Sequence, residues 1–265
     1  MSDLDQAFIK AYGRLDAACA PPESSTSSVP PPHFPLAEPE QPSFRPMLQV
    51  ERFVWPDICC RLEETVPEAL DRVADGVATA ATAGRKVIAL CGCRRGEGAT
   101  TMLLCTARRL ARPGRKVVMV DADLANPRIA RRMNLAPDFG WEEVLRGTQP
   151  LEEAVIESSS KPLAVLPVCN PLKDDPSSEE CDSRLAQDLR TLAEHYDLVL
   201  VDWGPLDDLE STDRPRQCRI GERLDAVALV HNARLTEPSR LAALRHCLAA
   251  TGIAELGVIE NFLRN

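Results

Sequence analysis

From residue 84 onward, the apolar residues of this chain form short continuous runs separated by amphipathic stretches. Runs without polar alternation are typical of strands that helices cover on both faces. Helical spacing is found between several runs, at residues 100–112, 183–195 and 237–251. Alternating strands and helices predict an α/β fold with a doubly wound, mainly parallel sheet. The expected strands are KVIALCG (86–92), RKVVMVD (115–121), LAVLPV (163–168), DLVLVD (197–202), DAVALVH (225–231) and ELGVIEN (255–261).

The chain before residue 84 divides into two parts. Residues 1–50 are rich in proline and serine, apart from a short amphipathic segment at residues 3–18. Such a composition buries too little surface to offset the entropy of ordering, so we expect a disordered tail. A plain linker is the first interpretation of it, and a proline-rich docking peptide is the alternative. Residues 51–83 are expected to be a helical lead-in to the α/β domain at 84–265.

Composition and charge argue against several classes of protein. The net charge of −9 disfavours general nucleic-acid binding, because phosphate backbones require a basic surface. No apolar run approaches the roughly 20 residues of a membrane helix, and the N-terminus lacks a secretion-signal pattern, so we expect a cytoplasmic protein. The ten cysteines lack the paired spacing of a zinc site, which favours buried, reduced thiols over metal binding or redox sensing.

The sequence GCRRGEGATT, at residues 92–101, follows the first strand and precedes an amphipathic helix. Strand, glycine-rich loop and helix N-terminus together can hold phosphate, because backbone N–H groups and the helix dipole converge there. The usual motif places a lysine directly before its Ser/Thr, but Ala99 occupies that position here. A glycine turn that only caps a helix is the alternative. The residues expected around the phosphates are Cys93, Arg95, Gly96, Glu97, Gly98, Ala99, Thr100 and Thr101.

Two further strands end in carboxylates. RKVVMVDADLANPR carries Asp121 and Asp123, and DLVLVD ends at Asp202. The carboxyl ends of parallel strands meet at one edge of the sheet, where open α/β folds bind ligands. Carboxylates there can hold Mg²⁺ through its waters or orient an attacking group. We therefore expect a magnesium site at Thr100, Asp121 and Asp202; a helix cap or an ion-pair partner is the alternative for any one acid.

These motifs resemble those of the MinD/ParA-type P-loop ATPases, and most of all the cytoplasmic bacterial tyrosine kinases and exopolysaccharide regulators of the CpsD/CapB group. The resemblance covers residues 67–261 and rests on six matches in order. They are GEGATT, VMVDADLANP, FGWEEVLRG, LAVLPVCNP, HYDLVLVDWGP and LGVIEN. The resemblance implies a P-loop nucleotide-binding fold with ATP or ADP and Mg²⁺ as cofactors.

The resemblance also assigns roles to single residues. It implies that Asp121 and Asp123, with the third acid, organise Mg²⁺ and the transferred phosphoryl group. It implies that Asn261 reads adenine. Arg94 falls where MinD/ParA-type relatives keep a second, signature lysine, which makes it a candidate catalytic cation. Together with Arg95 it could replace the charge missing from the loop; a solvated pair of loop arginines is the alternative.

Three departures from the family pattern bear on activity. Ala99 removes a cation from developing negative charge, a loss on the order of 3–4 kcal/mol in the transition state. The family's C-terminal tyrosine cluster is missing, so Tyr12 is the candidate acceptor in cis and Tyr196 is expected to be structural. The positions of the family's ring-forming E-x-x-R-x-x-R helix read Glu68, Asp71 and Ala74.

The leading hypothesis is a nucleotide-binding regulator of exopolysaccharide biosynthesis with weak or absent phosphotransfer. The alternatives are an active ATP-dependent protein-tyrosine kinase of the same family and a scaffold that binds no nucleotide. The expected partner is a membrane-embedded polysaccharide chain-length (co-polymerase) protein, which would recruit the cytoplasmic chain to the inner face of the membrane. A homo-oligomer is also expected, whereas nucleic acid is not.

Overall fold

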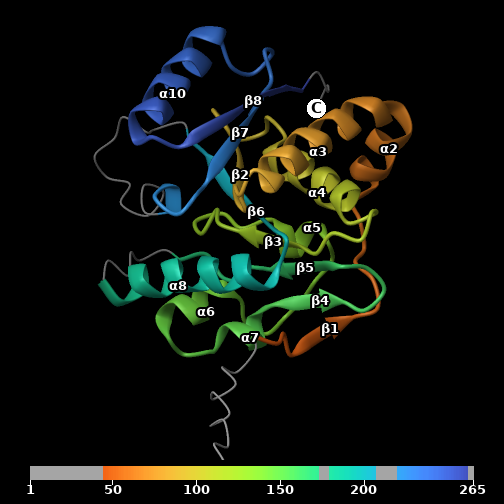
Figure 1. The fold of residues 1–265 in the computed structure, drawn as a ribbon, viewed down its shortest axis with the longest axis vertical. Helices are drawn as coiled ribbons and strands as arrows, with labels where there is room; N and C mark the ends of the chain where they lie inside the picture. The colour runs from red at the N-terminus through yellow and green to blue at the C-terminus, as the bar shows by residue number, and fades with distance from the viewer. Residues whose placement is uncertain (1–43, 173–178, 207–219, 262–265) are drawn as a thin grey trace, which may run out of the picture. The chain divides into compact units, whose positions relative to one another are not determined.

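An eight-stranded sheet forms the centre of the computed structural model, which describes residues 44–172, 179–206 and 220–261 (Figure 1). Its strands are β1 (Leu48–Val50), β2 (Val87–Gly92), β3 (Val117–Asp121), β4 (Ile156–Ser158), β5 (Leu163–Leu166), β6 (Leu198–Pro205), β7 (Ala226–His231) and β8 (Ala254–Glu260). Their spatial order is β1-β4-β5-β3-β6-β2-β7-β8, and all neighbours pair in parallel except β4 with β5. The six predicted strands and the doubly wound, mainly parallel sheet are confirmed.

The two strands that the sequence did not predict, β1 and β4, have three residues each. They pair in parallel, with Leu48 opposite Ile156. Because β1 lies in the range expected to be tail, the sheet begins inside that range. Residues 1–43, including Tyr12, lie outside the described residues. Strands this short offer too few positions for their periodicity to reveal them.

Helices cover both faces of the sheet. In β2, Ile88 and Leu90 pack toward one layer, and Ala89 and Cys91 pack toward the other, which explains why the strand is apolar throughout. The first layer contains α2 (Asp57–Thr65), α3 (Pro67–Thr82), α4 (Ala99–Leu110) and α5 (Ile129–Arg132). The second contains α6 (Trp141–Arg146), α7 (Leu151–Ala154), α8 (Glu179–His195) and α10 (Pro238–Thr251). The predicted helices correspond to α4, α8 and α10, and the range 51–83 contains α2 and α3.

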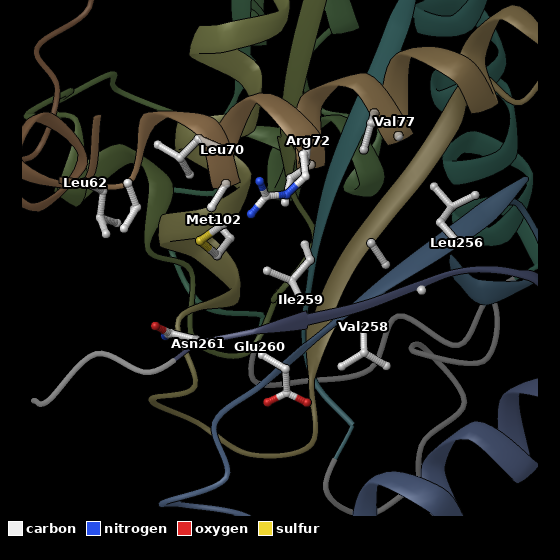
Figure 2. Close-up of a pocket in the computed structure, with 16 residues that line it drawn as sticks. Leu62, Leu70, Arg72, Val77, Met102, Leu256, Val258, Ile259, Glu260 and Asn261 are labelled. Carbon is white, nitrogen blue, oxygen red and sulfur yellow. The ribbon is translucent and has the colours of Figure 1, made fainter. Parts of the chain in front are cut away.

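An elongated apolar groove lies between α3 and the edge strand β8 (Figure 2). Its volume is about 640 Å³, and Leu70, Val77 and Ile259 are among the side chains that line it. Arg72 extends from α3 toward β8 within it, whereas Glu260 points to the other side of the strand (Figure 2). One end of the groove reaches the glycine-rich loop region, so its shape bears on the site described below.

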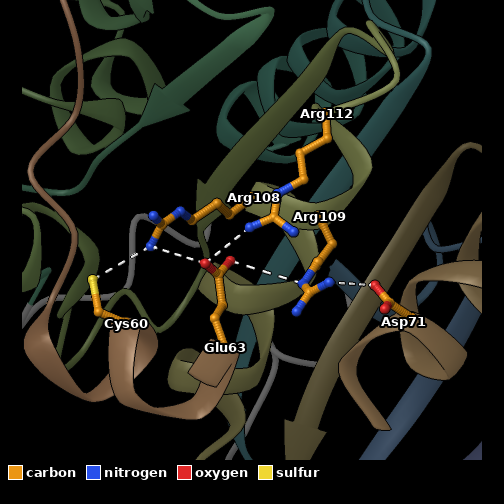
Figure 3. A network of polar contacts seen from close by, with 6 residues as sticks. All are labelled: Cys60, Glu63, Asp71, Arg108, Arg109 and Arg112. Carbon is orange, nitrogen blue, oxygen red and sulfur yellow. Dashed lines mark hydrogen bonds and ion pairs between the residues drawn. The ribbon is translucent and has the colours of Figure 1, made fainter. Parts of the chain in front are cut away.

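A cluster of ion pairs fastens α2 and α3 to the last turn of α4 (Figure 3). Glu63 of α2, whose side chain is 10% exposed, lies among three arginines. Its Oε2 is 2.9 Å from Nη2 of Arg112 and 3.5 Å from Nη1 of Arg108, and its Oε1 is 3.9 Å from Nε of Arg109. Arg109 also pairs with Asp71 of α3. A single carboxylate thus joins helices that lie beside the glycine-rich loop.

The segment FGWEEVLRG, one of the six matched motifs, contains α6 and connects it to its surroundings. Trp141 is fully buried, and its Nε1 donates to Asp188 of α8 at 2.8 Å. The buried carboxylate of Glu142 accepts hydrogen bonds from the backbone N–H groups of Cys169 and Asn170, at 3.0 and 2.9 Å. These contacts hold α6 against α8 and the segment after β5, so the motif has a structural role.

In the part of the chain that the structure describes, we next consider the cysteines, possible metal ligands and possible membrane-spanning helices. Eight cysteines in this part of the chain carry free thiols, and five of them are buried. No group of three or more His, Cys, Asp or Glu side chains among the described residues could hold a metal ion. Within residues 44–172, 179–206 and 220–261, no helix is both long and apolar enough to cross a membrane.

Candidate functional site

The glycine-rich loop joins β2 to α4 and turns on two glycines in left-handed conformations. Gly96 has a φ of 94° and Gly98 a φ of 99°, a region that is costly for any residue with a Cβ atom. At Gly98 an ideal Cβ would also lie 2.5 Å from Nδ2 of Asn261. Glycine is therefore required at the point where α4 begins.

Glu97 holds this loop from inside. The residue is 1% exposed, and its Oε2 accepts a hydrogen bond from the backbone N–H of Arg94 at 2.8 Å. Its Oε1 accepts from the N–H of Asn232 after β7, at 3.4 Å. The backbone carbonyl of Glu97 accepts from Nδ2 of Asn261 at 2.6 Å. Because its carboxylate is used within the protein, Glu97 can offer a ligand only its backbone.

A cavity of about 390 Å³ opens over this loop and the first turn of α4. Most of the residues singled out from the sequence meet in its wall, although they come from segments far apart in the chain. Those that line it are Arg94, Arg95, Gly96, Glu97, Gly98, Ala99, Thr100, Thr101, Asp123, Asp202 and Asn261. Two of the expected site residues, Cys93 and Asp121, do not.

Cys93 and Asp121 have other positions. Cys93 is 1% exposed and belongs to the hydrophobic core, where burial, followed by the nearby Glu97 carboxylate, raises the pKa of its thiol to about 11. Asp121 is fully buried, and its Oδ2 accepts hydrogen bonds from the backbone N–H groups of Arg128 and Ile129, both at 2.8 Å. It therefore holds the start of α5, the helix-cap alternative considered for a single acid.

Asp202, at the end of β6, is a buried carboxylate in the cavity wall with a raised pKa. It is 2% exposed, and burial is the main cause that raises its pKa to about 6, with the charge of Asp123 adding to the effect. A hydrogen bond from the Thr100 hydroxyl and the charge of Arg132 act in the opposite direction. The group thus changes charge near neutral pH and is directly linked to the start of α4.

Two of the acids have the chemistry of magnesium ligands. Asp121 and Asp202 are register partners on the adjacent strands β3 and β6. Each has a buried Oδ1 atom with no hydrogen-bond partner among the described residues. Burial and the charge of Asp202 raise the pKa of Asp121 well above its ordinary value. Two unpaired carboxylate oxygens and the Thr100 hydroxyl fit a hydrated dication whose other ligands are phosphate and water.

The loop arginines already have partners. Arg95 forms a two-pronged ion pair with Asp123, with Nη1–Oδ2 and Nη2–Oδ1 distances of 2.9 and 3.3 Å. Nη1 of Arg94 donates to the carbonyl of Leu235 at 3.3 Å, and the residue is exposed. Both guanidinium groups therefore contact the protein, unlike those of a fully solvated pair.

Three cationic residues of the cavity wall were not singled out from the sequence. They are Arg61 of α2, Arg128 before α5 and Arg132 at the end of α5. The last two are four residues apart in PRIARR, the spacing at which helical side chains share a face. That spacing was visible in the sequence, but the direction of this face toward the loop was not.

Asn261 lies between the cavity over the glycine-rich loop and the apolar groove of Figure 2. Leu62, Met102 and Asn261 line both spaces. A ligand with a polar end over the loop could therefore extend an apolar or aromatic part past Asn261. This position is compatible with the role in base recognition that the resemblance implies.

Comparisons with known proteins agree with this geometry. The family model described as "Cellulose biosynthesis protein BcsQ" matches residues 85–235. Tyrosine-protein kinase YwqD of Bacillus subtilis (strain 168) is 31% identical over 167 residues, which cover 63% of this chain and 68% of that protein. The solved BceF tyrosine kinase domain is 26% identical with a TM-score of 0.63, covering 76% of this chain and 81% of that one. The septum site-determining protein MinD of Pyrococcus horikoshii OT3, solved with Mg-ADP, shares the fold at 23% identity and a TM-score of 0.55, covering 66% of this chain and 70% of that one.

The family match spans more than half of the chain and includes the glycine-rich loop and the three acids. The relatives include both tyrosine kinases and a MinD protein. The chain therefore belongs to the BcsQ family of MinD/ParA-type P-loop ATPases, related to the bacterial tyrosine kinases of the CpsD group.

Proposed function

We propose that this protein is a nucleotide-binding regulator of exopolysaccharide biosynthesis with weak or absent phosphotransfer. The observation that carries the proposal is the cavity at the start of α4, whose glycine loop is held in shape by Glu97 and Asn261. Its volume of about 390 Å³ lies within the range of small-molecule sites, and a helix N-terminus favours phosphate. The MinD relative solved with Mg-ADP supports the same ligand class.

Each part of ATP or ADP has residues suited to it. The backbone N–H groups from Gly96 to Thr101 would bind the phosphates. Thr100, Asp202 and Asp121 would hold Mg²⁺, which would neutralise part of the phosphate charge. Asn261 would contact the base, with the apolar groove beside it.

The same contacts favour binding over phosphotransfer. Ala99 leaves the loop without the lysine that ordinarily reaches the β and γ phosphates. Asp123 is paired with Arg95 through both of its oxygens, so it is not free to orient an attacking group. Losing one pre-positioned cation typically costs a hundredfold or more in rate, whereas the backbone contacts that bind phosphate remain.

The nucleotide would act as a signal rather than as a phosphoryl donor. Relatives carry the names of cellulose biosynthesis and of tyrosine kinases, which supports a role in polysaccharide production. We place the chain beside a membrane-embedded chain-length protein at the inner face of the membrane, with its nucleotide state read through conformation. Self-association is part of the same proposal.

Titration of the full chain with fluorescent ATP and Mg²⁺ tests the proposal directly. We expect saturable binding at micromolar concentrations that excess ADP displaces and EDTA weakens. An absence of saturable binding, in a preparation shown by thermal unfolding to be folded, would leave the scaffold alternative in its place.

The active-kinase alternative is favoured by the 31% identity to YwqD and needs an acceptor. Tyr196 does not suit this role, because it is 3% exposed and its hydroxyl donates to Oε1 of Glu157 at 2.7 Å. Tyr12, outside the described residues, remains the candidate. Incubation with labelled ATP separates the two functions: robust labelling that Tyr12→Phe abolishes would establish the kinase, and negligible labelling supports the regulator.

A further inference from the structure

The cavity over the glycine-rich loop is cationic although its loop lacks the lysine. Five arginines line it, against three acidic residues. The acids are Glu97, Asp123 and Asp202, and the carboxylate of Glu97 is directed into the protein. The positive charge of the cavity therefore comes from arginines and not from a lysine at position 99.

The five arginines differ in their contacts and in how exposed they are. Arg95 is committed to Asp123, and Arg94 contacts the carbonyl of Leu235. Arg61 is exposed on α2. Arg128, just before α5, and Arg132, at its end, are in contrast half-buried in the cavity wall.

Of these five arginines, Arg132 has a side-chain hydrogen bond to the first turn of α4. Its Nη1 donates to Oγ1 of Thr101 at 3.1 Å, which holds the guanidinium against the first turn of α4. Thr101 is itself 8% exposed, so the contact lies at the inner wall of the cavity. The hydrogen bond uses one of the five N–H groups of the guanidinium, and the charge of this group also acts on Asp202 in the cavity wall. The remaining N–H groups are the donors that an incoming anion would engage.

The geometry points to Arg132, supported by Arg128, as the residue that binds the nucleotide phosphates in place of the lysine absent from position 99. A guanidinium suits this task because its planar set of donors can engage two phosphate oxygens at once. Arg132 reaches the cavity from α5, whereas a loop lysine would reach it from α4. This inference rests on the proposed nucleotide binding and names the residue that makes it possible without a lysine.

The first test compares Mg-ATP affinity among single variants of the full chain. Arg132→Gln is expected to weaken binding at least tenfold, as for the loss of a charged hydrogen bond. Arg132→Lys keeps the charge but loses the planar fork, so an intermediate loss is expected. The matched control is Arg131→Gln, which removes an exposed neighbouring arginine that does not line this cavity and should change affinity less than twofold.

A second test separates phosphate binding from simple support of Thr101. In an Ala99→Lys background the loop carries its own cation, so Arg132→Gln should cost less than threefold there. If Arg132 only positioned Thr101, the loss of affinity would be equal in both backgrounds. Thermal unfolding without nucleotide checks that each variant is folded.

The outcomes distinguish this inference from the proposed function. If the wild-type chain fails to bind Mg-ATP, the proposed function is wrong and the inference falls with it. If the wild type binds and Arg132→Gln binds as tightly as Arg131→Gln, only the inference is overturned.

Discussion

At the residue scale, burial rather than residue type decides what each acid of the site can do. Asp123 forms an ion pair with Arg95, Asp121 is bonded through one oxygen to the start of α5, and Asp202 accepts a hydrogen bond from Thr100 at the start of α4. Three carboxylates that look equivalent in the sequence thus have three different environments. Burial raises the pKa of Asp202 to about 6, so its charge depends on pH near neutrality.

Replacing Asp202 by Asn should stabilise the nucleotide-free protein above pH 6. The folded-state pKa of Asp202 is about 6, above the ordinary 3.8, so the folded state holds this proton more tightly than the unfolded chain does. Stability from this group is present below pH 4 and is lost as the pH rises through 6. We expect the variant to gain on the order of 1–3 kcal/mol at pH 7 and nothing at pH 4.

Thermal unfolding of both proteins between pH 4 and pH 8 measures this difference. The variant should also bind Mg-ATP less tightly, because an amide is a poorer magnesium ligand than a carboxylate. A stability difference that stays constant across this pH range would show that Asp202 does not titrate as described.

Ala99→Lys should raise any ATP turnover by tenfold or more, because it restores a cation near the transferred phosphate. Ala99→Gln, a neutral side chain of similar reach, is the control and should give no increase. Phosphate release from labelled ATP is the measurement. Equal turnover in all three proteins would mean that the missing lysine is not what limits the chemistry.

At the scale of elements, the site depends on helices that are tied to one another beneath it. The glycine-rich loop precedes α4, and two arginines in the last turn of α4, with Arg112 just after it, converge on Glu63 of α2 (Figure 3). In α3, Asp71 pairs with Arg109 and Ala74 is 6% exposed. Two positions of the family's ring-forming motif are therefore used within the protein.

Glu63→Gln should destabilise the protein by on the order of 1–3 kcal/mol, since it leaves three converging arginines without their shared charge. For a domain of this size, that corresponds to a fall in Tm of roughly 3–10 °C. Glu64→Gln, at an exposed position in the same helix, is the matched control and should change Tm little. Similar Tm values for the two variants would show that the cluster adds no stability.

At the scale of the whole molecule, strand order creates the site. β2, β3 and β6 are far apart in the sequence but adjacent in the sheet, with β6 between the other two. Their carboxyl ends therefore bring the loop, Asp121 and Asp202 to one edge. The apolar groove lies beside this edge because β8 and α3 are neighbours there (Figure 2).

Much of this arrangement could be predicted from the sequence, for a physical reason. The six predicted strands were visible as continuous apolar runs because both of their faces are buried. The three helices were visible because burial of one face imposes a helical period on the residues. Parallel pairing then requires that loop and acids share an edge, so most of the expected site residues meet in one cavity. The strands β1 and β4 were not predicted, because three residues are too few to show a periodic pattern.

The sequence by itself determined the fold class, the position of the loop and the absence of its lysine, because these follow from local composition and spacing. Only the tertiary structure decided which side chains face the cavity. Glu97 turns inward, Asp121 holds α5, and Arg132 reaches Thr101, since each direction depends on packing between elements distant in the chain. No periodicity within one segment records such contacts.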